Sequence, residues 1–177
     1  MIIDIGDAIV VLGDSLLSEA IAKLTGPVSH IGMVSKKTCN EPGCTNPAHW
    51  EVTQALSDGI KTLTLAGTMA TARYGYCLHD NLFALPDRQK MVAWGLKQIG
   101  VPYAFKDLAL EAIDAITRTE TASIYFDENG ADICSQYYSM AAIQVGRSCD
   151  VSPRKATPSD WFEYSLKQTS WLTQPIT

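Results

Sequence analysis

Short apolar or alternating segments, separated by turn residues, recur in the first half of the chain. An apolar run at residues 8–12, bounded by glycines, predicts a short buried strand, and residues 28–34 predict a second. Residues 50–56 and 60–65 flank a Ser-Asp-Gly turn and predict a hairpin, and residues 74–78 predict a further strand. The first half of the chain therefore favours a sheet.

Apolar residues at helical spacing mark the remaining elements. Most of these segments have residues typical of helix ends on both sides. At the start, there is an N-cap or first-turn residue: Asp14, Asp87 or Thr157. After the apolar stripe, there is a glycine: Gly26, Gly100 or Gly146. The predicted helices follow Asp14, follow Asp87, span residues 105–118 and 133–145, and begin at Thr157-Pro158. Residues 36–49 are polar and predict a loop insertion between two strands. Strands followed by helices make the expected fold class α+β.

Composition narrows the functional classes. With 177 residues, a single domain over residues 1–177 is expected, and 46% apolar with 19% charged residues is ordinary for a globular protein. A net charge of −5 argues against nucleic acids and anionic membranes as partners, because both require a basic surface. No apolar run approaches the length of a membrane span, and the acidic N-terminus lacks the basic start of a secretory signal. We therefore expect a chain that is cytoplasmic as synthesised.

Cys134 is the strongest candidate for chemistry. Five cysteines are an odd number, which favours reduced thiols over a disulfide framework. Cys134 stands where the polar residues 126–132 give way to a predicted helix. Backbone N–H groups and the positive end of the helix dipole favour a thiolate there, and the thiolate is the nucleophilic form of cysteine. The alternative is a buried cysteine that only fills space.

Among the three histidines, His30 is the best candidate for the base. It lies on a predicted strand beside small residues, Ser29 and Gly32, that leave room for its ring. His49 lies in the predicted loop, and His79 in an expected turn.

These motifs, in this order, resemble the NlpC/P60 cysteine hydrolases. The pattern consists of Gly6-Asp7 before an apolar strand, residues 29–34, residues 100–103 (Gly-Val-Pro-Tyr), and Cys134-Ser135-Gln136 opening a helix. Because the histidine precedes the cysteine, the chain resembles the circularly permuted branch, the YiiX/YebB-like proteins with a permuted papain-type fold. The resemblance implies a central antiparallel sheet or half-barrel packed against helices, with the nucleophile at a helix N-terminus.

The resemblance also implies residue roles. Cys134 would be the nucleophile and His30 the general base. Gln54 stands at the position of the family's third, imidazole-orienting residue, with Glu51 in reserve. Tyr103 and Ser135 would contact the substrate, the backbone N–H of Cys134 would stabilise the oxyanion, and Asp7 would be structural.

A cysteine hydrolase that cleaves an amide through an acyl-enzyme is the activity implied, most directly on a peptidoglycan peptide and without a cofactor. Acyl transfer and the hydrolysis of lipid amides remain open. The amide of Gln54, in place of a carboxylate, keeps a non-catalytic peptide- or lipid-binding member open as well. A phage lysis protein or a toxin delivered to a periplasm by a dedicated system would fit a small acidic member, and a toxin would need an immunity or inhibitor protein as partner.

Cys39, Cys44 and His49 form a separate pattern within the loop insertion. Two cysteines and a histidine at five-residue spacing could hold a metal, with a fourth ligand from elsewhere. The cysteines could also form a disulfide after export, or the segment could be a plain solvated loop. The sequence leaves these three alternatives open.

Overall fold

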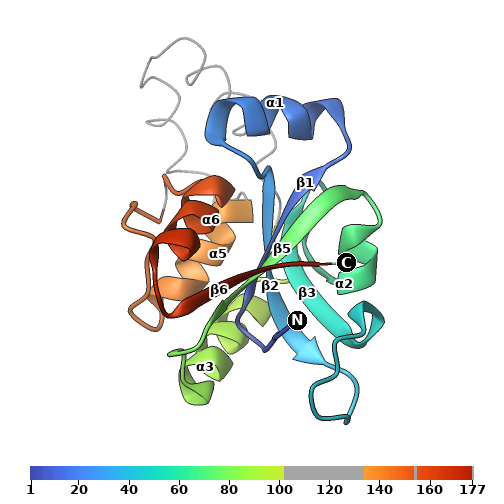
Figure 1. Cartoon of the computed structure of the whole chain (residues 1–177), viewed down its shortest axis with the longest axis vertical. Coiled ribbons are helices and arrows are strands. Elements are labelled where there is room, and N and C mark those ends of the chain that lie inside the picture. Colours follow the sequence, from blue (N-terminus) through green and yellow to red (C-terminus); the bar gives the residue numbers. More distant parts are fainter. Residues whose placement is uncertain (102–133, 154, 177) are drawn as a thin grey trace.

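The computed structural model describes residues 1–101, 134–153 and 155–176. Its strands form one six-stranded antiparallel sheet in the order β4-β3-β2-β1-β5-β6 (Figure 1). The strands are β1 (Ala8–Gly13), β2 (His30–Lys37), β3 (Trp50–Leu56), β4 (Gly59–Thr64), β5 (Ala72–Asp80) and β6 (Trp171–Pro175). The expected α+β class with an antiparallel sheet packed against helices is confirmed.

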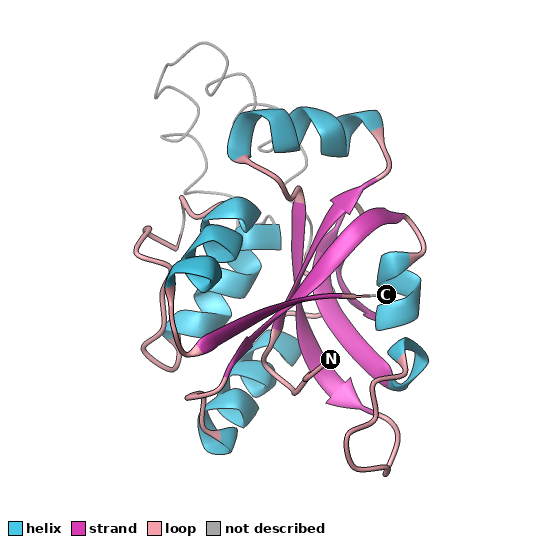
Figure 2. Ribbon diagram, in the orientation of Figure 1, coloured by secondary structure: helices cyan, strands magenta, loops and turns pink. Residues whose placement is uncertain are grey.

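Helices cover both faces of the sheet. The helices are α1 (Leu16–Thr25), α2 (Leu65–Met69), α3 (Leu85–Leu96), α5 (Cys134–Ile143) and α6 (Pro158–Lys167), with a short 3-10 helix, η1 (Pro47–His49). In Figure 2, the helices α3, α5 and α6 lie to one side of the strands and the short helix α2 to the other.

Strand β1 is buried on both faces, which explains its unbroken run of apolar residues. Ala8 and Val10 contribute to a large core cluster with residues of α3, α5 and α6. Ile9 and Val11 contribute to a second cluster on the opposite face. Apolar burial on both faces therefore fixes β1 as the centre of the molecule.

The pairing of β2 with β3 stops short of one end, and α5 packs against both strands. The register of the pair begins at Met33 opposite Thr53, so the residues of β2 before Met33 have no partner in β3. Helix α5 contacts both strands. The first turn of α5 is thereby brought against the free edge of β2.

Strand β2 continues to Lys37, so the predicted loop at residues 36–49 begins two residues too early. The pairing of Lys36 with Glu51 and of Lys37 with Trp50 extends the strand, since ladder hydrogen bonds outweigh the weak strand propensity of lysine.

Three further boundaries or elements differ from the prediction. The N-cap of α1 is Ser15 rather than Asp14, and neither α2 nor β6 was predicted. Helix α2 has only 5 residues, too few for a helical period to be recognised.

The helix predicted at residues 105–118 lies outside the described residues. Within the described part of the chain, no helix has the length and apolarity needed to cross a membrane.

Candidate active site

Three side chains that the sequence predicted as a catalytic set converge where the pairing of β2 with β3 stops. Cys134 is the first residue of α5, His30 the first residue of β2, and Gln54 lies near the end of β3. The Cys134 thiol is hydrogen-bonded to the His30 ring. His30 Nε2 lies 2.7 Å from Gln54 Oε1. The three side chains therefore form one hydrogen-bonded chain, although they come from distant parts of the sequence.

The orientation of the Gln54 amide is determined by Thr68, which the sequence did not indicate. The Thr68 hydroxyl donates to the backbone carbonyl of Thr64 at 3.2 Å. Its oxygen then accepts from Gln54 Nε2 at 2.9 Å. Because the amide nitrogen is engaged there, Gln54 presents its oxygen to His30.

The hydrogen bonds from Thr68 through Gln54 to His30 also determine the tautomer of His30. An amide oxygen only accepts, so His30 Nε2 must carry the hydrogen that it donates to Gln54. The remaining ring nitrogen, Nδ1, is left for the Cys134 thiol. A neutral His30 in this tautomer can accept the thiol proton, which is the condition for a general base.

The surroundings favour charge separation between the two groups. Burial by itself would raise the pKa of Cys134, but the charge and hydrogen bond of His30, together with the backbone N–H groups of Ile31 and Ser135, outweigh it and lower this pKa. Burial would lower the pKa of His30, but the thiolate charge and the hydrogen bonds to Cys134 and Gln54 raise it. Each charge thus stabilises the other, because the imidazolium lowers the pKa of Cys134 and the thiolate raises the pKa of His30.

Gly32 provides the space that Gln54 occupies. A Cβ atom at Gly32 would lie 2.7 Å from Val52 Cγ1, 3.1 Å from Gln54 Cβ and 3.4 Å from Gln54 Oε1. A larger residue would therefore press on Val52 and on the base of the Gln54 side chain, which are both buried and have little room to move, and would disturb the contact of Gln54 with His30.

The remaining predicted site residues have different positions. Glu51 does not reach His30 and instead pairs with Lys36 at 3.5 Å. Ser135 is only 1% exposed, and its backbone N–H donates to the Cys134 sulfur, so a contact of its hydroxyl with substrate stays a prediction. Tyr103 lies outside the described residues.

A second histidine is buried, but its contacts are structural. His79 lies within β5, not in the expected turn, because β5 continues to Asp80. Its Nδ1 is 2.8 Å from Asp7 Oδ2, and the other oxygen of Asp7 accepts from Arg88. Arg88, 2% exposed, also donates to the backbone carbonyls of Ile5 and Phe83 and to the carbonyl of Asp80. Asp7 thus ties the N-terminal turn to β5 and α3, in agreement with the structural role expected for it.

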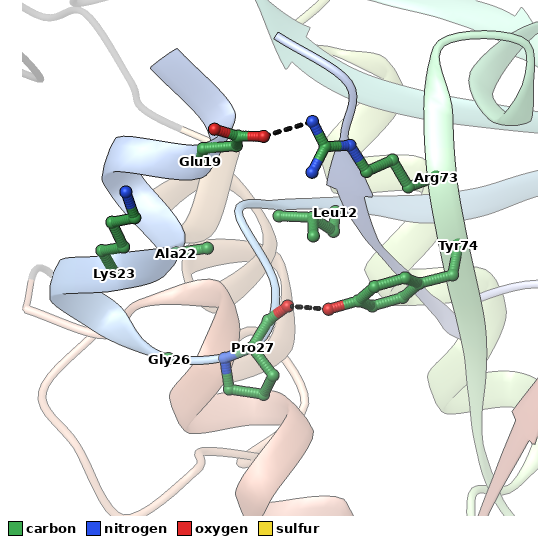
Figure 3. A pocket seen from close by; sticks show the side chains of 8 residues that line it. All are labelled: Leu12, Glu19, Ala22, Lys23, Gly26, Pro27, Arg73 and Tyr74. Atoms are coloured by element: carbon green, nitrogen blue, oxygen red, sulfur yellow. Dashed lines mark hydrogen bonds and ion pairs between the residues drawn. The ribbon is translucent and has the colours of Figure 1, made fainter. Parts of the chain in front are cut away.

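A separate pocket of about 500 Å³ lies between α1 and β5 (Figure 3). Arg73 pairs with Glu19 across its rim, and the Tyr74 hydroxyl donates to the carbonyl of Pro27 at 2.7 Å. The pocket is lined by Leu12, Glu19, Ala22, Lys23, Gly26, Pro27, Arg73 and Tyr74. None of the three converging side chains lines it, so it is distinct from the candidate active site.

A solved structure shares this fold. The chain is similar to the crystal structure of the metalloprotein yiiX from Escherichia coli O157:H7, which is described as DUF1105. The TM-score is 0.64 and the sequence identity 15%, over 96% of this chain and 95% of that chain. At this identity the similarity shows the fold alone. No protein-family model matches the sequence, and no curated protein matches it significantly.

Proposed function

We propose that this protein is a cysteine hydrolase of the permuted papain-like class that cleaves an amide bond through an acyl-enzyme. The observation that carries the proposal is the hydrogen-bonded chain from Cys134 through His30 to Gln54. A nucleophile, a base and a group that orients the base are the three parts that covalent catalysis by cysteine requires. The similarity of the fold to yiiX supports it, because the sequence resemblance also pointed to YiiX-like proteins.

In the first half of the reaction, the Cys134 thiolate attacks the carbonyl carbon of the substrate and the carbonyl π electrons move to oxygen. When the tetrahedral intermediate collapses, the C–N bond breaks, and the His30 imidazolium gives its proton to the departing amine. The product of this half is a thioester on Cys134.

In the second half, the neutral His30 removes a proton from water, and the resulting hydroxide attacks the thioester. The C–S bond breaks, Cys134 leaves as a thiolate, and the acid product is released. The start of α5 would supply donors to the oxyanion in both halves, with the backbone N–H of Cys134 as the first candidate.

The amide of Gln54 is compatible with catalysis. Papain-like proteases use a neutral asparagine as the third member of the set. Gln54 offers the same acceptor, and its Thr68 contact holds that acceptor toward His30. This argues against the non-catalytic binding protein that the missing carboxylate had kept open.

We propose a peptide of the bacterial cell wall as the substrate, on the strength of the NlpC/P60 resemblance. Action on that substrate would require delivery to the periplasm, and a toxin of this kind would require an immunity protein. Acyl transfer or cleavage of a lipid amide would use the same three residues.

The test is digestion of purified peptidoglycan by the full chain, with the released fragments identified by mass spectrometry. We expect new amino and carboxyl termini with the native chain, and none with Cys134→Ala or His30→Ala. Cys149→Ala is a matched control, since Cys149 is also buried and burial raises its pKa.

Full hydrolysis by folded Cys134→Ala would refute a cysteine mechanism. If the native chain releases no fragments, a panel of lipid amides and acyl acceptors follows, and failure of every substrate together with an unreactive Cys134 would leave a binding protein.

A further inference from the structure

Three potential metal ligands converge in the segment between β2 and β3. The Sγ atoms of Cys39 and Cys44 and a ring nitrogen of His49 all lie within 4.8 Å of one another. Cys44 Sγ is 3.3 Å from His49 Nδ1. Cys44 is buried, and Cys39 and His49 are half-buried, so the cluster is set into the protein while remaining open to an ion.

The backbone brings Cys44 and His49 together through two local turns. Gly43 has a φ of +67°, the left-handed conformation that turns the chain back immediately before Cys44. Asn46 then caps η1, with its side chain accepting from Ala48 N at 3.0 Å, and η1 ends at His49.

A buried tryptophan anchors this arrangement to the sheet. Trp50 is 3% exposed, and its Nε1 donates to the carbonyl of Cys44 at 3.0 Å. Trp50 also pairs with Lys37 in the β2–β3 ladder. Cys44 and His49 are therefore held by the sheet, and the Cys39 side chain completes the group from the end of β2.

The spacing of the three atoms suits a tetrahedral ion. Zn²⁺ binds thiolate sulfur at about 2.3 Å and imidazole nitrogen at about 2.0 Å, which separates neighbouring ligand atoms by about 3.5–3.8 Å. The 3.3 Å contact and the 4.8 Å limit bracket that range, so the side chains need only small adjustments to surround an ion. A disulfide between the cysteines would not explain why His49 lies against Cys44.

We propose that Cys39, Cys44 and His49 form a binding site for Zn²⁺. Within the described residues, this group contains no fourth His, Cys, Asp or Glu side chain, so a solvent ligand completes the tetrahedron. Two thiolates balance the charge of the ion. His30 and Gln54 lie toward the opposite end of the β2–β3 pair, so the ion closes the connection between the strands and takes no part in the proposed hydrolysis.

The experiment is a titration of the full chain with Co²⁺, a spectroscopic substitute for Zn²⁺, carried out anaerobically after reduction. The protein carries Cys134→Ser, so that the candidate nucleophile cannot bind the ion. We expect one equivalent of Co²⁺ to produce thiolate charge-transfer absorption and the visible bands of a tetrahedral site. Excess Zn²⁺ should remove both.

Three variants assign the site. Cys39→Ser and Cys44→Ser should each weaken binding about 100-fold or more, since even residues that only support metal ligands cost about 10–100-fold when replaced. His49→Ala should weaken binding while retaining thiolate absorption. Cys149→Ser is the control and should bind like the parent, with circular dichroism showing that every variant is folded.

Absence of thiolate absorption in the folded, reduced protein would overturn the proposal. Unchanged Co²⁺ binding by Cys39→Ser and Cys44→Ser would overturn it as well, since the ion would then lie elsewhere. Neither result bears on the hydrolase proposal, because the titration uses a protein without the Cys134 thiol.

Discussion

Replacing Thr68 by valine should disable the candidate site without touching any of its three members. Valine has the shape of threonine and lacks the hydroxyl. The change removes the acceptor of Gln54 Nε2, which lies 2.9 Å from Thr68 Oγ1, in a place where Gln54 is 1% exposed and Thr68 7% exposed. Water therefore cannot easily replace the lost partner.

The expected size of the effect of Thr68→Val follows from the burial of Gln54 and Thr68. Leaving a buried donor without an acceptor costs about 1–3 kcal/mol. That cost falls on the amide orientation that presents oxygen to His30, so the flipped orientation, which cannot accept from His30 Nε2, becomes competitive. Since about 1.4 kcal/mol corresponds to a factor of ten, we expect the reactive ion pair to lose roughly tenfold in population.

The assay is the rate of Cys134 carboxymethylation by iodoacetamide as a function of pH, which requires no substrate. The Gln54 hydrogen bond raises the pKa of His30, and His30 lowers the pKa of Cys134. Weakening the Gln54 bond should therefore shift the onset of alkylation to higher pH and slow the reaction about tenfold at pH 7.

Thr68→Ser is the matched control, because it keeps the hydroxyl and loses only a methyl group. Its rate should stay within about twofold of the native rate, whereas a role in packing alone would give the opposite order, with Thr68→Val near native and Thr68→Ser slowed. A native rate and pH profile in folded Thr68→Val would refute the reasoning.

Two further predictions concern space and buried charge. Gly32→Ala should slow alkylation of Cys134 severalfold at pH 7, because its Cβ would lie 3.1 Å from Gln54 Cβ; native reactivity would show that Gln54 need not stay in place. Asp7→Asn should lower the free energy of unfolding by about 3–5 kcal/mol, measured by urea denaturation, because it leaves the buried guanidinium of Arg88 without its carboxylate. Asp58→Asn, which removes an exposed ion pair, should leave the unfolding midpoint unchanged, and equal losses in the two variants would contradict the importance of burial.

The sequence predicted those parts of the fold that have strong local patterns. A strand-like segment ending at a Ser-Asp-Gly turn placed β3 correctly at Trp50–Leu56. Thr157-Pro158 placed the start of α6, where Thr157 and Asp160 form a capping box. Both signals are local, because each depends only on a few consecutive residues.

What depends on distant contacts could not be predicted. The sequence proposed Cys134, His30 and Gln54 through a family resemblance, and the structure brings them together. Thr68 carried no signal, because its importance comes from the packing of α2 against β3. His79 was assigned to a turn, because its contact with Asp7 joins residues 72 positions apart.

The central claim is that the Cys134 thiolate and the His30 imidazolium stabilise each other, and titration of the His30 ring by NMR tests it most directly. Comparison with His30→Ala assigns the signal among the three histidines. In the native chain, His30 should titrate above its usual value of about 6.5 and, in Cys134→Ala, well below its native pKa, because burial then acts without the thiolate to oppose it. An unchanged His30 pKa in folded Cys134→Ala would contradict the account.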